Sequence, residues 1–140
     1  MKKLTKVIGL VLTAAAAVLC VLIFWNGELF RRAQGKNDNP PEKIRLLEKA
    51  NRFYPWNFEA WQELGIAHFM SFQRYLQAMD QDLGEEHLQK SAAAYRRSIR
   101  LNPTSAAGHY YYAQTLRFLQ TLASNTPDPV SYTHLRAHET

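Results

Sequence analysis

The chain has 140 residues, of which 46% are apolar, and a single cysteine, Cys20, so it can form no intrachain disulfide. Its 17 Lys and Arg against 12 Asp and Glu give a net charge of +5, and residues 1–36 carry that whole excess. A nucleic-acid-binding module concentrates positive charge on its folded part, whereas residues 37–129 are neutral here. Composition therefore argues against nucleic-acid binding and against a disulfide-stapled fold.

Residues 1–6 form a short basic leader, and residues 7–25 follow it without a single charged side chain. As a helix, these nineteen residues would extend over about 28 Å, enough to cross the hydrocarbon core of a bilayer. Trp25, at the end of the run, suits the membrane interface, where aromatic side chains are enriched. The pattern predicts one transmembrane helix over residues 7–25.

A cleaved signal peptide is the main alternative, because it also combines a basic start with an apolar run and small residues. Here the apolar run continues beyond the small residues 14–17, which favours a retained anchor over a secreted protein. Leu19 stands before Cys20 where lipoprotein processing requires a small residue, so lipidation is not expected. Basic residues flank the run on both sides, and the predicted periplasmic or extracytoplasmic location of the remainder rests on the short leader staying in the cytoplasm.

Residues 26–41 are predicted to be a linker that ends in a helix start. Asn39 can cap the helix, Pro40 fits its first position, and Glu42 stands three residues after the cap, as in a capping box. An apolar face then recurs at three-residue spacing until Pro55 ends the helix. This helix opens the predicted helical domain, residues 42–129.

The two prolines Pro55 and Pro103 are each followed, six residues later, by the start of a new helical pattern, at Trp61 and at His109. Small and aromatic residues alternate before Pro103. This arrangement resembles the tetratricopeptide repeat, a unit of two antiparallel helices, although His68 and His109 depart from the family pattern. The residues that carry the resemblance, through close packing of small against large side chains, are Ala50, Pro55, Trp61, Leu64, Gly65, Ser91, Tyr95, Ser98 and Pro103.

The two prolines are 48 residues apart, against a family period of about 34 residues. Apolar residues continue at steps of three and four, which predicts that the first helix of the unit extends as far as Gly84. These residues would form one apolar face of the helix, which has two interpretations. It is either a deeper hairpin core or a docking face for a partner helix or a second copy in a homo-oligomer. Its positions are Phe69, Phe72, Leu76, Met79 and Leu83.

Enzyme motifs are absent from the sequence: it has no Gly-rich phosphate loop, no G-x-S-x-G and no H-E-x-x-H. His68, His87 and His109 are scattered, and the acidic residues between 80 and 86 are typical of a solvated turn. We therefore predict no catalytic residue, no cofactor and no metal site.

A protein or peptide partner is what the resemblance implies, because stacked two-helix units form a concave surface lined by the first helix of each unit. The Tyr-rich run 109–112 favours this function, since tyrosine is enriched at binding hot spots. The implied fold is all-α: a transmembrane helix followed by antiparallel helical hairpins of an α-solenoid, acting as a scaffold at a bacterial envelope. The groove candidates are Gln62, Glu63, Ile66, Met70, Tyr110, Tyr111, Gln114 and Arg117.

Residues 130–140, VSYTHLRAHET, resemble the translation of a transposase-type sequencing adapter over their whole length. His134 and His138 have the spacing of zinc ligands on a helix, but an adapter-derived segment is excluded from fold reasoning. We expect the natural chain to continue differently after Pro129. The alternative function follows from this expectation: the repeats would be the docking arm of an enzyme of polysaccharide or cytochrome assembly whose catalytic part is missing.

Overall fold

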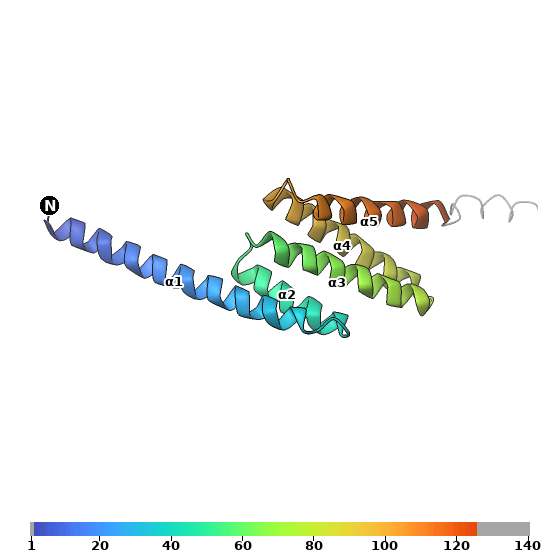
Figure 1. Ribbon diagram of the computed structural model, residues 1–140, viewed down its shortest axis with the longest axis horizontal. Helices are drawn as coiled ribbons and strands as arrows, with labels where there is room; N and C mark the ends of the chain where they lie inside the picture. Colours follow the sequence, from blue (N-terminus) through green and yellow to red (C-terminus); the bar gives the residue numbers. More distant parts are fainter. Residues whose placement is uncertain (1, 126–140) are drawn as a thin grey trace, which may run out of the picture.

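The computed structural model describes residues 2–125, which form helices joined by short turns (Figure 1). No strand occurs in that part of the chain, and the predicted all-α fold is confirmed. The segment 130–140, with His134 and His138, lies outside the described residues. The helices are α1 (Lys2–Gln34), α2 (Pro40–Phe53), α3 (Phe58–Gln77), α4 (Gln81–Leu101) and α5 (Ala106–Asn125).

The long helix α1 extends far beyond the other four helices, and only its C-terminal part packs against them (Figure 1). By length and composition it can cross a membrane. Its apolar side chains lie on the outside of the molecule: Leu10 and Phe24 are each 72% exposed. Such a surface is stable in lipid, whereas in water it would be an exceptionally large apolar patch.

The expected linker 26–41 is helical over most of its length, since α1 continues without a break to Gln34. Leu29 and Ala33 face α2 and are buried, and ion pairs of Glu28 with the two following arginines support the exposed side of this helix. Only residues 35–39 connect α1 to α2. Asn39 caps α2 through its side-chain oxygen, which accepts the Glu42 N–H at 3.3 Å.

Asn26 ties three helices together at the first polar position after the apolar run. Its Nδ2 donates to the Ala50 carbonyl oxygen near the end of α2, at 2.9 Å. Its Oδ1 accepts from Nδ2 of Asn57, at 2.8 Å, and Asn57 in turn accepts the Ala60 N–H at the start of α3. Because Asn26 is only 3% exposed, this junction fixes α1 to the helical domain without water between them.

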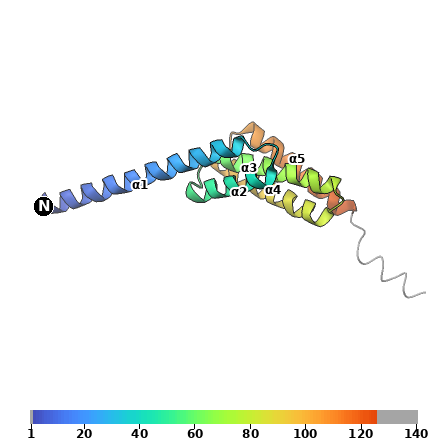
Figure 2. The same cartoon turned by 90° about the horizontal axis from the view of Figure 1, so that it is seen from below.

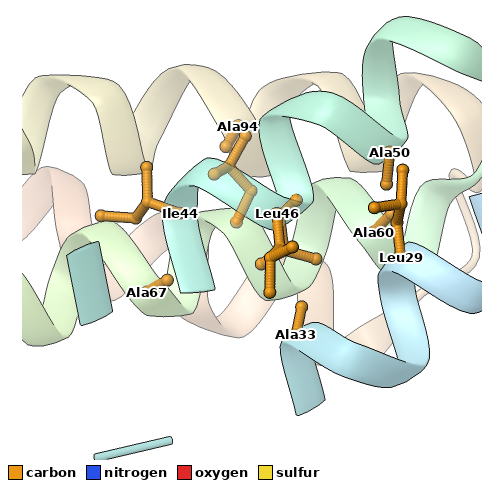
Figure 3. Close-up of a cluster of buried hydrophobic side chains, with 10 residues drawn as sticks. Leu29, Ala33, Ile44, Leu46, Ala50, Ala60, Ala67 and Ala94 are labelled. Atoms are coloured by element: carbon orange, nitrogen blue, oxygen red, sulfur yellow. The ribbon is translucent and has the colours of Figure 1, made fainter. Parts of the chain in front are cut away.

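From α2 onward, each helix packs chiefly against its neighbours in the chain. Half of the residues in the central cluster are alanines, which lets the helices approach closely (Figure 3). The cluster comprises Leu29, Ala33, Ile44, Leu46, Leu47, Ala50, Ala60, Leu64, Ala67 and Ala94.

The tightest helix contact is that of α3 with α4. A Cβ atom at Gly65 would lie only 2.7 Å from Cε1 of Tyr95, so glycine is what allows the tyrosine ring to lie on the α3 backbone. On either side of this contact a serine of α4 donates to a carbonyl oxygen of α3, Ser91 to Gly65 at 2.8 Å and Ser98 to Phe58 at 2.9 Å. These bonds satisfy buried hydroxyl groups and fix the register of the pair.

The prediction that α3 would run as far as Gly84 is wrong, because α3 ends before Met79. This residue has a φ of 56°, in the left-handed region. Its N–H donates to the Leu76 carbonyl oxygen at 3.2 Å, and the next N–H, of Asp80, donates to that of Tyr75 at 3.0 Å. This pair of bonds is the Schellman closure of a helix end, formed here without the usual glycine.

Asp80 then starts α4, because its side chain accepts the Leu83 N–H at 3.2 Å. Gly84 lies in the first turn of α4, where an added Cβ would meet the Phe72 ring at 3.5 Å. The apolar face expected over residues 69–83 is therefore divided between two antiparallel helices. Leu76, Met79 and Leu83 of this face are exposed.

Replacing Gly65 by alanine is expected to lower the free energy of unfolding by about 1–3 kcal/mol, since the new methyl group overlaps the Tyr95 ring. The matched control is Gly84→Ala, whose methyl group makes only an ordinary contact. Urea unfolding of the full chain in micelles, followed by circular dichroism, measures both. A Gly65→Ala variant as stable as the Gly84→Ala variant would contradict the close approach of α3 and α4.

Candidate functional site

The two proline turns make the same hydrogen bond. Trp61 donates its ring N–H to the carbonyl oxygen of Pro55, at 2.9 Å, and His109 donates from Nε2 to that of Pro103, also at 2.9 Å. Both bonds join a proline to the residue six positions later. This explains why Trp61 and His109 stand at the same distance from their prolines. His109, which departs from the family pattern in sequence, replaces the indole N–H with its own ring nitrogen.

The helix starts after these turns also correspond. Asn57 caps α3 by accepting the Ala60 N–H at 3.2 Å, and Ser105 caps α5 by accepting the Gly108 N–H at 3.1 Å. Each cap stands two residues after its proline. The turns after α2 and after α4 are therefore two copies of one structural motif, 48 residues apart.

A hollow of about 110 Å³ lies between α3, α4 and α5, where three of the groove candidates, Ile66, Tyr111 and Gln114, come together. A second hollow of about 300 Å³ adjoins it along α5 and is lined by Gln114, Arg117, Phe118 and Thr121. Gln114 borders both hollows, and we call the two together the α3–α5 groove. Its remaining lining residues are Phe69, Tyr95 and Thr115.

Two other candidates are engaged in contacts that hold the fold. Glu63 forms an ion pair of 2.7 Å with Lys43 of α2, whose side chain is only 4% exposed. Gln62 accepts a hydrogen bond of 3.3 Å from the Ser105 hydroxyl in the α4–α5 turn. Met70 is half-buried on α3. Gln62 and Glu63 thus contact neighbouring elements, and none of the three residues lines the two hollows.

Tyrosines form one end of the α3–α5 groove. Tyr111 stacks on Tyr95 with ring centroids 5.8 Å apart, and Tyr110 lies edge-on to Tyr111 at 5.4 Å. Tyr110 is 64% exposed. Burial raises the pKa of the Tyr95 phenol above its ordinary value, so the floor of the groove is uncharged.

Phe118 forms the other end, and sequence reasoning missed it. Its ring lies 5.5 Å from that of Phe69 and 5.7 Å from that of Phe72, which joins α5 to α3. Its position could have indicated it, because Phe118 stands seven residues after Tyr111, two helical turns along the same face of the helix. The groove thus offers aromatic surface at both ends with an amide and a guanidinium group between them.

His68 and His87, which appear scattered in the sequence, meet between α3 and α4. Their Nδ1 atoms are 3.0 Å apart, and the ring of Tyr75 stacks on His87. Burial, and next the neighbouring His87, lowers the pKa of His68 to about 4, and burial also lowers that of His87. Both rings are uncharged at neutral pH, so one can donate its N–H to the other.

Metal-binding geometry is not found in residues 2–125, which contain no group of three or more His, Cys, Asp or Glu side chains able to hold an ion. The two-histidine contact joins two helices and lies away from the α3–α5 groove. Comparisons with known proteins give no further guide, because no family model, curated protein or solved structure matches the chain.

Acidification is expected to destabilise the domain through His68. Its folded-state pKa of about 4 lies below the ordinary 6.5, so the unfolded chain binds the proton first as the pH falls. The domain has its full stability above pH 6.5, and between pH 6.5 and 4 it loses about 3 kcal/mol. Urea unfolding at a series of pH values measures this slope.

The variant His68→Gln should show a much shallower slope over the same interval. His109→Gln is the matched control, because His109 is exposed at the start of α5, away from the histidine pair, and it should keep the slope. Equal slopes in the two variants would show that the buried histidine pair is not the source of the pH dependence.

Proposed function

We propose that the chain is a membrane-anchored scaffold of the tetratricopeptide-repeat type that binds a protein or peptide partner in the α3–α5 groove. The observation that carries the proposal is the meeting of Ile66, Tyr111 and Gln114 around one hollow. These residues come from the first helices of two successive units, which form the concave side in such repeats.

The repeat assignment is supported by the duplicated proline turn and by the Gly65–Tyr95 contact. Consecutive packing of the helices agrees with it. In this scheme residues 26–34 of α1 act as the first helix of a unit completed by α2, α3 and α4 form the second unit, and α5 begins a third. The anchor and the first repeat would then share one helix.

A peptide-binding role is supported by the chemistry of the groove. Aromatic rings offer large contact area at low entropic cost, and Gln114 and Arg117 can pair with backbone or acidic groups of a ligand. Within residues 2–125, the histidine pair His68 and His87 joins α3 to α4.

The proposed location is the extracytoplasmic side of the membrane. The apolar length of α1 supports a single-pass anchor. Burial of Leu29 and Ala33 against α2 supports an anchor that stays attached, because the same helix also completes the core of the domain.

Peptide display on the full chain in nanodiscs tests the function. Selected peptides should lose affinity by roughly tenfold or more for the variants Gln114→Ala and Arg117→Ala, which remove groove contacts but leave the Tyr95–Tyr111 stack in place. Gln120→Ala, an exposed position on the same helix, is the matched control and should leave affinity unchanged. Selection of no peptide, or of peptides insensitive to both groove variants, would contradict the proposal.

A further inference from the structure

One end of the helical domain faces the free half of α1. Both views place the α2–α3 turn and the α4–α5 turn at that end, and the α3–α4 connection at the opposite end (Figures 1 and 2). If α1 crosses a membrane, as the proposed function requires, these two turns are the part of the domain nearest to the bilayer.

The junction at Asn26 sets the height of this end above the bilayer. Ala50 is level with Asn26, because the two are joined by a hydrogen bond of 2.9 Å. α2 runs antiparallel to α1, and its last three residues continue about 4.5 Å further toward the apolar run. Phe53 therefore lies beside residues 7–25, at the level where α1 is already uncharged and Trp25 marks the interface.

Large aromatic side chains at this level are exposed. Trp56 in the α2–α3 turn is 62% exposed, Phe53 is 39% exposed and Trp25 of α1 is 51% exposed. Trp56 touches Tyr54 edge-on, at a centroid distance of 5.6 Å, and most of its ring has no protein contact. Tryptophan is favoured in the headgroup layer, where its apolar ring and its N–H are both accommodated.

Charge is distributed unequally between the two ends of the domain. The C-terminal halves of α2 and α4, which lead into the two proline turns, carry exposed cations that form no ion pair within residues 2–125: Lys49, Arg52, Arg96, Arg97 and Arg100. The exposed carboxylates Glu48 and Glu59 lie near the same end, which keeps an excess of positive charge. The opposite end, around the α3–α4 connection, carries the acidic residues Asp80, Asp82, Glu85 and Glu86. The basic end is the one that faces the bilayer.

A hollow of about 420 Å³ between α2 and α4 extends this basic surface. Arg96, Arg97 and Arg100 line it together with the ring of Trp61. Lys90 and Glu48 also border it, and Lys90 is paired with Glu86. Its size and charge suit a phosphate-bearing headgroup, and each cation held at an anionic lipid surface adds to the attraction.

We propose that this end of the domain is a lipid-binding surface, seated on the membrane that α1 spans. Phe53 and Trp56 enter the headgroup layer, while Lys49, Arg52 and Arg100 contact anionic phospholipid. The surface fixes the tilt of the domain, so that the α3–α5 groove keeps one orientation relative to the bilayer.

The experiment uses the full chain in nanodiscs that contain phosphatidylglycerol, with an environment-sensitive fluorophore on one cysteine at a time. The three positions are native Cys20 in α1 and, in a Cys20→Ser background, Trp56→Cys and Met79→Cys. Met79 is the matched control, since it is an apolar residue, 90% exposed, at the opposite end of the domain. Aqueous iodide and headgroup spin labels serve as the two quenchers.

The proposal expects the label at position 56 to be shielded from iodide and quenched by the lipid spin label, and the label at position 79 to show the reverse. If the label at Cys20 is shielded from iodide and the label at position 56 is accessible to it, the lipid-binding surface is contradicted and the membrane anchor is not. A water-accessible Cys20 would instead overturn the anchor itself. Shielding at position 56 without lipid quenching would mean that another protein surface covers it, which also contradicts the proposal.

Charge provides the second arm. The double variant Arg52→Gln and Arg100→Gln should shift the balance between shielded and exposed states of the position-56 label by roughly thirtyfold in nanodiscs with anionic lipid. It should have little effect in pure phosphatidylcholine. Arg74→Gln, at the opposite end, is the control and should change neither. A double variant that behaves like this control would overturn the electrostatic contribution.

Discussion

The buried amide of Asn26 is the constraint on which the rest of the structure depends. A polar group taken out of water destabilises a protein unless its hydrogen bonds are made, and here both atoms of the amide find partners, one from α2 and one from the start of α3. The same residue ends the apolar run of α1. A single side chain thus joins the apolar helix to two helices of the domain and allows no independent hinge between them.

This rigid attachment has consequences at both ends of the domain. The proline turns are held at the height of the apolar run, where Trp56 and its basic neighbours face the proposed lipid surface. The helical hairpin of α3 and α4 extends from the same junction, and the contact of Gly65 with Tyr95 sets the spacing on which the α3–α5 groove depends. The apolar helix, the turns and the groove are therefore joined through one set of contacts.

Much of this fold could be predicted from local signals in the sequence. The apolar run, the cap at Asn39 and the stops at Pro55 and Pro103 act within a few residues, so their effect can be recognised without tertiary information. The equal spacing of six residues between each proline and the next ring-bearing residue can also be recognised in the sequence. Its cause is the repeated hydrogen bond from a ring nitrogen to the proline carbonyl oxygen.

The rest depended on contacts between distant residues. The segment 26–34 contains charged residues and a glycine, a composition that predicts a linker, although Leu29 and Ala33 make it a packed helix. Met79 ends α3 in a conformation that usually needs glycine, and no local pattern indicates it. Phe118 belongs to the candidate groove, but only the approach of α5 to α3 reveals this.

The central claim, that α1 and the helical domain move as one body, is tested most directly by electron–electron double resonance between native Cys20 and a cysteine at position 79. Both sites are exposed, one on the apolar half of α1 and one at the far end of the domain. The account predicts a single narrow distance distribution in nanodiscs, which broadens when Asn26 is replaced by alanine. A broad or multiple distribution in the unaltered junction would contradict it.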